Sequence, residues 1–236
     1  MKAETTYFAV DFKTRSKCEN LYTKYKLGKY IGKGAYAKVF DVCKAEKDCK
    51  YVLKVSTYDQ SIYNLTGLES HSMQSYYNRW VREIDMHSAM EKCQVNFYYK
   101  FTPILYDAWY CLEGNQALFY MVIEKYDGNL FDFIKKFKRN GEDVQKLLRS
   151  YVKTILRDLK ISLHHVHNTC NICINDIKME NILYKEKDAE YIFVFADFGL
   201  TSKCSINPDE ECKKEDRRKL DVTIETFLNQ LGVSSD

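Results

Sequence analysis

The sequence predicts an α+β protein with two lobes, the first built on a five-stranded, mostly antiparallel sheet with one inserted helix and the second mainly helical. Short runs rich in Tyr, Val and Leu alternate with turn residues through the first half of the chain. In the second half, apolar residues recur at helical spacing over long segments. The composition is that of an ordinary globular protein, with 45% hydrophobic and 29% charged residues.

The first lobe follows a mixed lead-in segment of residues 1–24 and extends over residues 25–125. Its five predicted strands are Tyr25–Ile31, Ala37–Ala45, Tyr51–Val55, Ile104–Cys111 and Leu118–Glu124. Turn residues 32–34 and a charged tip at 46–48 separate the first three strands, and Glu113-Gly114-Asn115 is a hairpin signal. A helix is predicted over Met73–Met90, with Trp80 and Ile84 at helical spacing, whereas residues 57–71 are too irregular for an element.

The second lobe is predicted to extend over residues 126–236, because the pattern changes near Lys125–Gly128. Its longest helix has apolar residues on one face, namely Leu147, Leu148, Tyr151, Ile155, Leu159 and Leu163. The predicted elements in chain order are a helix at Leu130–Phe137, the long helix at Val144–Val166, strands at Ile172–Ile174, Ile182–Tyr184 and Tyr191–Phe195, and a helix from about Arg217 to Leu231. A cleft between two such lobes is a natural ligand site.

Composition excludes several classes of protein. The 36 basic and 33 acidic residues leave a formal net charge of +3, which is too small to indicate direct nucleic-acid binding. The 19 Tyr, 13 Phe and 2 Trp supply enough apolar surface for a core, which excludes disorder. Because no apolar run approaches the ~20 residues that span a bilayer and none resembles a secretion signal, we expect no membrane contact and a cytoplasmic or nuclear protein that is not secreted.

The nine cysteines are accordingly expected to be reduced thiols. Cys170-x-x-Cys173 is spaced like half of a zinc site, and three histidines precede it. A full structural site needs a second pair, however, and Cys204 and Cys212 are eight residues apart. We therefore interpret this cluster as a helix end that runs into a buried strand.

Two features of the first lobe suit the binding of a nucleotide's phosphates. In Gly32-x-Gly34-x-x-Ala37-x-Val39, small residues between two strands let backbone N–H groups approach phosphate oxygens. Lys54 lies within the apolar strand Tyr51–Val55, where a buried cation needs a partner, and Glu83 on the following helix is the best candidate. Either feature alone would also fit a plain hairpin turn or an edge lysine that reaches water.

Two motifs of the second lobe suit phosphoryl transfer. In Asp176-Ile-Lys178-Met-Glu-Asn181, an acid is followed by a base two residues later and an amide five residues later. Asp176 would receive or orient the proton of the attacking hydroxyl, Lys178 would neutralise the transferring phosphate and Asn181 would bind magnesium. Asp197-Phe198-Gly199 ends a strand 21 residues after Asp176, and Asp197 would bridge magnesium to the phosphates.

With these four features in this order, the chain resembles the protein kinase superfamily from about Tyr25 to Leu231. The resemblance implies a bilobal kinase-like fold that uses ATP and Mg²⁺, with Lys54, Asp176 and Lys178 as catalytic residues and Asn181 and Asp197 as metal ligands. It implies that the adenine contacts backbone groups of Glu124 and Tyr126, with Ile123 as gatekeeper, and that Asp221 anchors the catalytic loop. The full set implied to surround the nucleotide is Ile31, Gly32, Lys33, Gly34, Ala35, Tyr36, Ala37, Val39, Val52, Lys54, Glu83, Glu124, Tyr126 and Leu183.

The resemblance implies a serine/threonine protein kinase, since tyrosine kinases usually lack a lysine at the position of Lys178. Where the family has His-Arg-Asp, this chain has Ile174-Asn175-Asp176. Without that arginine, a phosphorylated activation loop has no evident cation to dock on, so we expect activity without such phosphorylation. No Ala-Pro-Glu segment follows Gly199.

The helices that usually complete the second lobe are also missing from the sequence, so we expect apolar surface there that a protein partner or a second copy of the chain covers. This layout resembles the small kinases of large DNA viruses, which would place the protein in a host cell, and also the kinase-like ATPase of the tRNA-modifying KEOPS complex. Two alternatives to a protein kinase therefore stay open. One is a nucleotide-binding pseudokinase or regulator that acts through a partner, and the other is a small ATPase.

Overall fold

The computed structural model describes residues 25–34, 37–44, 49–66, 68, 72–95, 97–113, 115–138, 142–188, 190–204 and 209–232. These residues form two compact units, which we describe separately. Unit 1 holds the described residues up to Asn78 together with Tyr106–Ile123, and unit 2 holds Arg79–Leu105 together with the described residues from Glu124 onward. Within the described chain, no helix is long and apolar enough to cross a membrane. The predicted lead-in segment, residues 1–24, lies outside the described residues.

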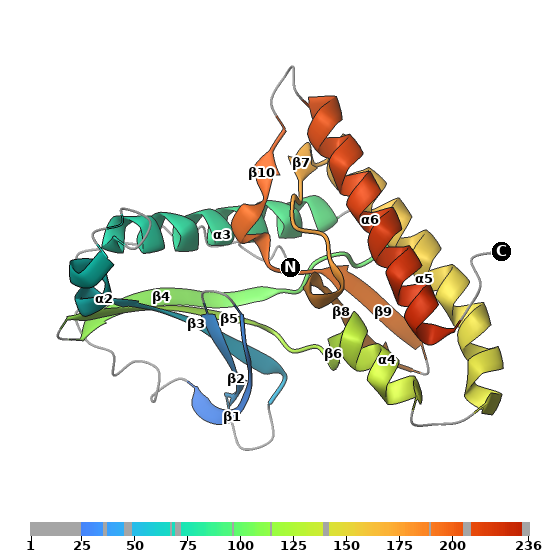
Figure 1. The fold of residues 1–236 in the computed structure, drawn as a ribbon, viewed down its shortest axis with the longest axis horizontal. Coiled ribbons are helices and arrows are strands. Elements are labelled where there is room, and N and C mark those ends of the chain that lie inside the picture. The colour runs from blue at the N-terminus through green and yellow to red at the C-terminus, as the bar shows by residue number, and fades with distance from the viewer. Residues whose placement is uncertain are drawn as a thin grey trace, which may run out of the picture. The chain divides into compact units, whose positions relative to one another are not determined.

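Unit 1 is built on the predicted five-stranded sheet, so the α+β fold class is confirmed (Figure 1). Its strands are β1 (Lys26–Lys33), β2 (Ala37–Cys43), β3 (Tyr51–Asp59), β4 (Leu105–Glu113) and β5 (Gln116–Glu124), in the order β1-β2-β3-β5-β4. Its core is largely aromatic: Trp109 stacks on Tyr25 and on Tyr120, with ring centroids 6.1 and 5.0 Å apart. Such pairs fill a small sheet-covered core with few side chains.

The segment between the third strand and the first predicted helix differs from expectation. Residues 57–71 were predicted to form no element, yet β3 extends to Asp59 and α2 (Gln60–Thr66) follows directly. The Asp59 carboxylate accepts the backbone N–H of Ser61 at 2.9 Å, and the Gln60 N–H donates to the carbonyl of Asn115 at 3.0 Å. The second bond comes from the distant β4–β5 hairpin, so the helix start depends on a contact that local sequence cannot reveal.

Unit 2 contains most of α3 (Met73–Gln94), from Arg79 onward, and the helices α4 (Leu130–Lys138), α5 (Glu142–Asn168) and α6 (Asp209–Leu231). Strands β6 (Gly128–Asn129), β8 (Ile182–Lys187) and β9 (Glu190–Phe195) form one antiparallel sheet, and β7 (Ile172–Cys173) pairs with β10 (Ser202–Lys203). The α5 and α6 helices lie side by side (Figure 1). The described part of unit 2 also contains single 3₁₀ turns at Met179–Asn181 and Phe198–Leu200.

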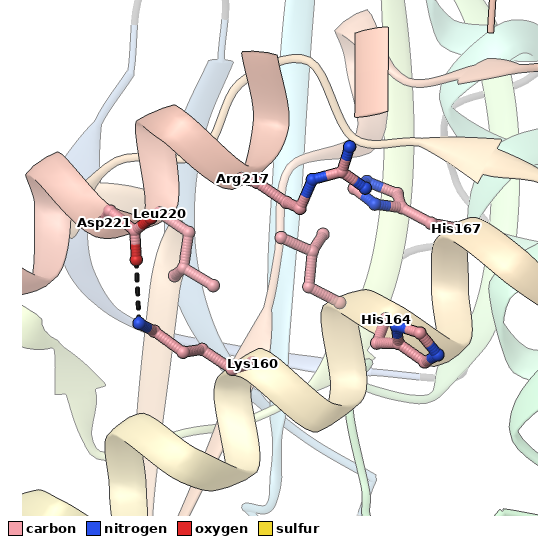
Figure 2. A pocket seen from close by; sticks show the side chains of 7 residues that line it. Lys160, His164, His167, Arg217, Leu220 and Asp221 are labelled. Atoms are coloured by element: carbon pink, nitrogen blue, oxygen red, sulfur yellow. Dashed lines mark ion pairs between the residues drawn. The ribbon is translucent and has the colours of Figure 1, made fainter. Parts of the chain in front are cut away.

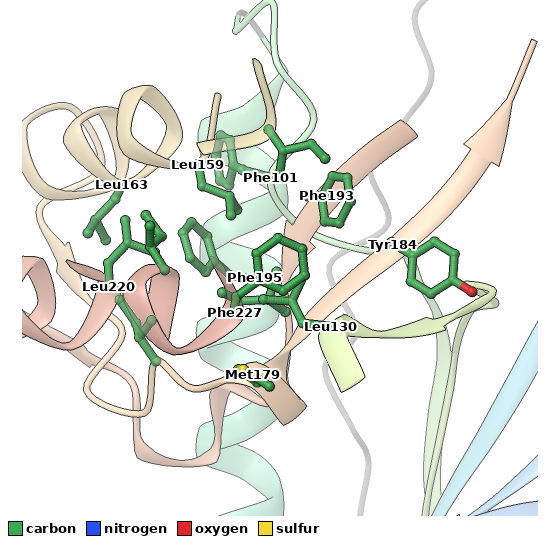
Figure 3. Packing of buried hydrophobic residues seen from close by; sticks show 14 of the residues in the cluster. Phe101, Leu130, Leu159, Leu163, Met179, Tyr184, Phe193, Phe195, Leu220 and Phe227 are labelled. Carbon is green, nitrogen blue, oxygen red and sulfur yellow. The ribbon is translucent and has the colours of Figure 1, made fainter. Parts of the chain in front are cut away.

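The core of unit 2 joins these helices to the small sheet (Figure 3). Phe133 of α4, which is fully buried, lies at its centre. Its ring has five aromatic neighbours at centroid distances of 4.5–5.9 Å, namely Phe137, Tyr184, Tyr191, Phe193 and Phe227. This packing fixes α4, α6, β8 and β9 relative to one another. The loop between β7 and β8 carries Asp176 and Lys178, two of the three residues predicted for catalysis.

The last helix also differs from expectation. It was predicted to start near Arg217 but begins at Asp209, so the mixed-charge stretch forms its first two turns. Its apolar residues Leu220, Ile224 and Phe227 are buried in the core. Its outward positions are largely polar, including Arg217, Arg218, Asp221, Glu225 and Gln230, with Val222 as an apolar exception at 49% exposure. The expected apolar surface is therefore not found on α6, where the outward face is already suited to water.

The expectation of reduced thiols is contradicted for seven described cysteines, one of which is Cys111. The structure contains disulfide bonds between Cys43 and Cys49, Cys93 and Cys170, and Cys173 and Cys212. Cys204 is buried, and its sulfur lies 3.0 Å from that of Cys173. The bonds join segments up to 77 residues apart, which is why sequence spacing did not indicate them.

Candidate active site

The loop after β7 presents the carboxylate of Asp176 in a defined orientation. The Lys178 ammonium donates to Asp176 Oδ2 at 2.7 Å, and the Asn181 side-chain amide donates to the same oxygen at 2.8 Å. Both bonds fall on Oδ2, and among the contacts of the described residues none reaches Oδ1. Asp176 keeps a quarter of its side chain exposed, so Oδ1 can accept a hydrogen bond from an incoming hydroxyl.

The fully buried residue Asp216 of α6 binds the backbone of this loop. Its carboxylate accepts the backbone N–H of Ile174 at 2.7 Å and that of Asn175 at 2.8 Å. Its Oδ2 also lies 3.0 Å from Nε2 of His167 at the end of α5. Asp216 thus fixes the backbone immediately before Asp176, because a buried carboxylate with three partners has few other positions.

The prediction that Asp221 anchors the loop is therefore wrong. Asp221 lies more than one helical turn further along α6, is exposed, and pairs with Lys160 of α5 at 2.8 Å (Figure 2). The two aspartates were hard to distinguish by sequence because the expected helix began eight residues too late. The signal that could have identified Asp216 is its position four residues before Leu220, which places it on the buried face of the helix.

A pocket of about 260 Å³ lies beside Asp221, between α5 and α6 (Figure 2). Its walls include Lys160, His164, Arg217 and Asp221. None of the residues predicted for catalysis or nucleotide binding lines it. The pocket is therefore separate from the residues around Asp176.

Asn175, which stands where the family has arginine, joins the catalytic loop to the segment after Gly199. Its side-chain amide nitrogen lies 2.9 Å from the carbonyl of Leu200 and 3.0 Å from Ser202 Oγ. The Thr201 hydroxyl donates back to the carbonyl of Ile174 at 3.1 Å. Asn175 adopts φ of 66°, a left-handed conformation that asparagine tolerates better than arginine. The substitution thus provides both the backbone conformation and neutral bonds between the two segments.

Asp197 lies two residues after the end of strand β9 and also has a left-handed backbone, with φ of 62°. The next residue, Phe198, is fully buried and its ring meets that of His87 on α3 edge-on, at 5.1 Å. A Cβ added at Gly199 would lie 3.6 Å from Asp197 Oδ1 and 3.9 Å from Glu83 Oε2. The anchored Phe198 therefore leaves Asp197 exposed beside Gly199, with Glu83 of α3 near the same point.

Asn181 and Asp197 are suitable donors for a hard divalent cation, because carboxylate and amide oxygens are the ligands that Mg²⁺ prefers. The amide nitrogen of Asn181 is directed at Asp176, so its carbonyl oxygen faces the opposite way. Asn181 and Asp197 lie in adjacent segments, since the backbone N–H of Ala196 donates to the backbone carbonyl of Asn181 at 2.8 Å. The residues of this part of the chain thus fit a magnesium ion between Asn181 and Asp197.

In unit 1, the pairing of β1, β2 and β3 places Gly32, Val39 and Lys54 next to one another across the sheet. Gly32 is paired with Val39 on β2, and Val39 is paired with Lys54 on β3. Cross-strand partners project from the same face of a sheet, so Val39 and Lys54 share one face, together with Val52 two residues earlier. Ala35 and Tyr36 of the predicted loop lie outside the described residues, and the predicted pair of Lys54 with Glu83, which would link the two units, stays a prediction.

The glycines of unit 1 have different neighbours. A Cβ at Gly28 would lie 3.0 Å from both Cβ and O of Asp41, so this glycine is required by packing. A Cβ at Gly32 would have no heavy atom within 4 Å, and one at Gly34 would meet only the Ala37 carbonyl at 3.8 Å. Packing within the described protein does not require glycine at 32 and 34, and the open space above the turn suits phosphate groups.

The predicted adenine contacts begin at Glu124, at the end of β5. Its backbone N–H donates to the Ile104 carbonyl at 2.8 Å, which leaves its carbonyl as the group it would offer to a base. Its carboxylate is bonded by Lys100 and Lys185. Burial opposes ionisation of Glu124, but these two ammonium groups outweigh it and hold its pKa below the ordinary value. Tyr126 is buried, with both ammonium groups within 6 Å of its ring.

The other residues predicted around the nucleotide are distributed over both units. Ile31 and Lys33 are exposed on β1, Ala37 and Val52 are buried, and Leu183 is half-buried on β8. The structure therefore brings together two local groups: Asp176, Lys178, Asn181 and Asp197 with Glu83 in unit 2, and Gly32, Val39, Val52 and Lys54 in unit 1. Sequence reasoning missed the supporting contacts of Asp216 and of Lys219, whose ammonium donates to the Asn175 carbonyl at 2.7 Å.

Comparisons with known proteins agree with this arrangement. A family model of the protein kinase domain matches residues 25–218. A probable cell cycle serine/threonine-protein kinase CDC5 homolog of Encephalitozoon cuniculi is 24% identical over 181 residues, which cover 77% of this chain and 32% of that protein. Calcium-dependent protein kinase 5 of Plasmodium falciparum is 27% identical over 191 residues, or 80% of this chain and 28% of that protein.

A third relative, the serine/threonine-protein kinase SKY1 of Saccharomyces cerevisiae, is 38% identical over 72 residues, or 30% of this chain and 9% of that protein. This chain thus spans about a third, or less, of the length of the curated relatives it matches.

Proposed function

Because this chain belongs to the protein kinase family, we propose that it transfers the γ-phosphoryl group of ATP to serine or threonine hydroxyls of proteins, with Mg²⁺ as cofactor. The observation that carries this proposal is the orientation of Asp176, whose Oδ2 is held by Lys178 and Asn181 while Oδ1 remains open. Bound magnesium would supply positive charge for the phosphates, and Asn181 and Asp197 would hold it.

In this proposal each residue has one task. Asp176 orients the attacking hydroxyl and receives its proton, and Lys178 adds positive charge near the transferring phosphate. Lys54, with Glu83 as its proposed partner, binds the non-transferred phosphates below the turn at Gly32. Two of the three relatives are named serine/threonine kinases, which supports the hydroxyl specificity inferred from Lys178.

The decisive experiment is transfer of labelled phosphate from ATP, with magnesium, to generic protein substrates. We expect Asp176→Asn and Asp197→Asn each to lower transfer by at least about 100-fold. Asp188→Asn is the matched control, because Asp188 is an exposed aspartate of the β8–β9 turn whose left-handed φ of 53° asparagine also accepts.

Other outcomes would contradict the kinase proposal. Nucleotide binding without transfer would favour a regulator that acts through a partner. Release of inorganic phosphate with no labelled acceptor would favour a small ATPase.

We further propose that this activity does not require phosphorylation of the segment after Gly199. Asn175 bonds that segment at Leu200 and Ser202, and the Arg82 guanidinium on α3 donates to the Thr201 carbonyl at 3.3 Å. These contacts position the segment without a phosphate group.

The test is phosphatase treatment, verified by mass spectrometry, followed by the transfer assay. Activity within twofold of the untreated protein is expected. A loss of tenfold or more, restored on rephosphorylation, would contradict the proposal.

A further inference from the structure

Three cysteine sulfurs meet at one point in unit 2, beside the catalytic loop. Cys173 ends β7, Cys204 follows β10, and Cys212 lies in the first turn of α6. Their sulfur atoms lie within 4.8 Å of one another. The Cys204 sulfur is 3.0 Å from that of Cys173 and 4.0 Å from that of Cys212. Residues separated by up to 39 positions thus direct the same soft donor atom into one small volume.

Backbone hydrogen bonds fix the positions of two of these cysteines. Cys173 is paired with Ser202 in the β7–β10 ladder. The Cys204 N–H donates to the Asn171 carbonyl at 2.9 Å, and the Asn171 side chain donates to the Cys204 carbonyl at 3.3 Å. Cys173 and Cys204 are buried, and Cys212 is half-buried. The donors are therefore held in place before any ligand arrives, which lowers the entropic cost of binding one.

We propose that, when the Cys173–Cys212 bond is reduced, the thiolates of Cys173, Cys204 and Cys212 bind one Zn²⁺ ion. Three sulfur donors select a soft or borderline cation over Mg²⁺ or Ca²⁺. In a tetrahedral site with Zn–S distances near 2.3 Å, sulfur atoms lie about 3.8 Å apart. Once the Cys173–Cys212 bond is reduced, side-chain rotation at both of these cysteines would provide that separation. The half-buried Cys212 side leaves the fourth position to water.

Cys204 distinguishes this proposal from a purely structural disulfide. A disulfide joins only two of the three adjacent sulfurs, whereas a zinc site uses all three. The other cysteine group of the described residues is less suited to a thiolate site, because it offers only two sulfurs, those of Cys93 and Cys170. Its third member, His165, is stacked on Phe97 with ring centroids 3.8 Å apart.

The consequence of zinc binding would be local. The ion would tie β7, which leads into Asp176, to the segment after Gly199 and to the start of α6, whose Asp216 holds the catalytic loop. The chemistry is balanced: a phosphine with one water reduces the disulfide to two thiols and becomes the phosphine oxide. Zn²⁺ then displaces the protons of the thiols it binds.

The test uses the full chain, reduced with a phosphine and kept without oxygen. Zinc uptake is measured by competition with a chromophoric chelator, and Co²⁺ serves as a spectroscopic substitute whose absorption reports thiolate ligands in a tetrahedral site. We expect one equivalent of zinc on the reduced wild type. Cys204→Ser is expected to bind at least tenfold more weakly and to lose the cobalt–thiolate absorption. Cys43→Ser in unit 1 and Cys170→Ser in the second group are expected to bind like the wild type.

A second comparison needs no variant. The oxidised wild type, in which Cys173 and Cys212 are bonded, should not take up the ion, and zinc should raise the melting temperature of the reduced wild type only. The proposal is overturned if the reduced wild type takes no zinc from the chelator, or if oxidised and reduced proteins bind equally. Equal binding by Cys204→Ser and the wild type would also overturn it. Because the readout is metal uptake, it stands independently of kinase activity.

Discussion

The buried carboxylate of Asp216 accepts the backbone N–H of Asn175 at 2.8 Å, which ties the catalytic loop to a helix that starts 34 residues later in the chain. This bond and its companion to Ile174 determine where Asp176 stands. We expect Asp216→Asn to lower the free energy of unfolding by about 2–4 kcal/mol, because an amide NH₂ would then face buried N–H donors. Urea unfolding measures this.

The control for that variant is Asp221→Asn on the same helix. Asp221 is exposed and has only a surface ion pair with Lys160, so the expected change in the free energy of unfolding is below about 0.5 kcal/mol. Equal effects of the two substitutions would show that Asp216 is not the anchor.

Asn175→Ala removes the side-chain bonds to Leu200 and Ser202. These bonds hold the loop that carries Asp176 against the segment after Gly199. We therefore expect the kcat for transfer to fall about tenfold, with a smaller change in the KM for ATP. Steady-state kinetics measure both constants. Asn168→Ala, which removes an exposed side chain bonded to His164, is the control and should leave kcat unchanged.

Two glycines of β1 should differ in how alanine affects the stability of the protein. Gly28→Ala places a Cβ 3.0 Å from Asp41, so unit 1 should lose about 1–3 kcal/mol in free energy of unfolding. Gly32→Ala has open space around the new methyl group, so its stability should stay within about 0.5 kcal/mol of the wild type, while the KM for ATP rises. Thermal unfolding and ATP titration separate the two effects. A strongly destabilised Gly32→Ala would assign that glycine to packing.

Glu91 of α3 gives the stability a pH dependence. Burial raises its pKa from 4.5 to about 7, although the Leu105 N–H and Lys100 lower it. A raised carboxyl pKa means that the folded state binds more protons than the unfolded state between these values. The protonated Glu91 carboxyl therefore contributes its full stabilisation below about pH 4.5. As the pH rises through 7, the free energy of unfolding falls by on the order of 1–3 kcal/mol.

Urea unfolding between pH 5 and pH 8 measures this slope. Glu91→Gln should flatten it, because the variant lacks the carboxyl group whose pKa is raised. Glu225→Gln, an exposed change on α6, should leave the slope as in the wild type. A stability that rises with pH over this range would contradict the raised pKa.

Much of the fold could be predicted because local pattern and tertiary structure agree. Strand runs such as Tyr51–Val55 and helical periodicity such as that of Met73–Met90 require only neighbouring residues, and the structure forms β3 and α3 there. The elements that were missed depend on distant partners. The start of α2 uses the carbonyl of Asn115, and the first turns of α6 are a charged stretch with no local apolar signal.

The motifs alone indicated the protein kinase family and the residues proposed for catalysis, because Asp176, Lys178, Asn181 and Asp197 occur in a fixed order that has a recognisable chemistry. The contacts that hold these residues in place became clear from the folded protein. Asp216, and not Asp221, binds the catalytic loop. Asn175 is bonded to Leu200 and Ser202. Cys204 lies beside Cys173 and Cys212. Hydrogen bonds and sulfur contacts between segments tens of residues apart depend on how the chain folds back on itself, and that information is absent from local spacing.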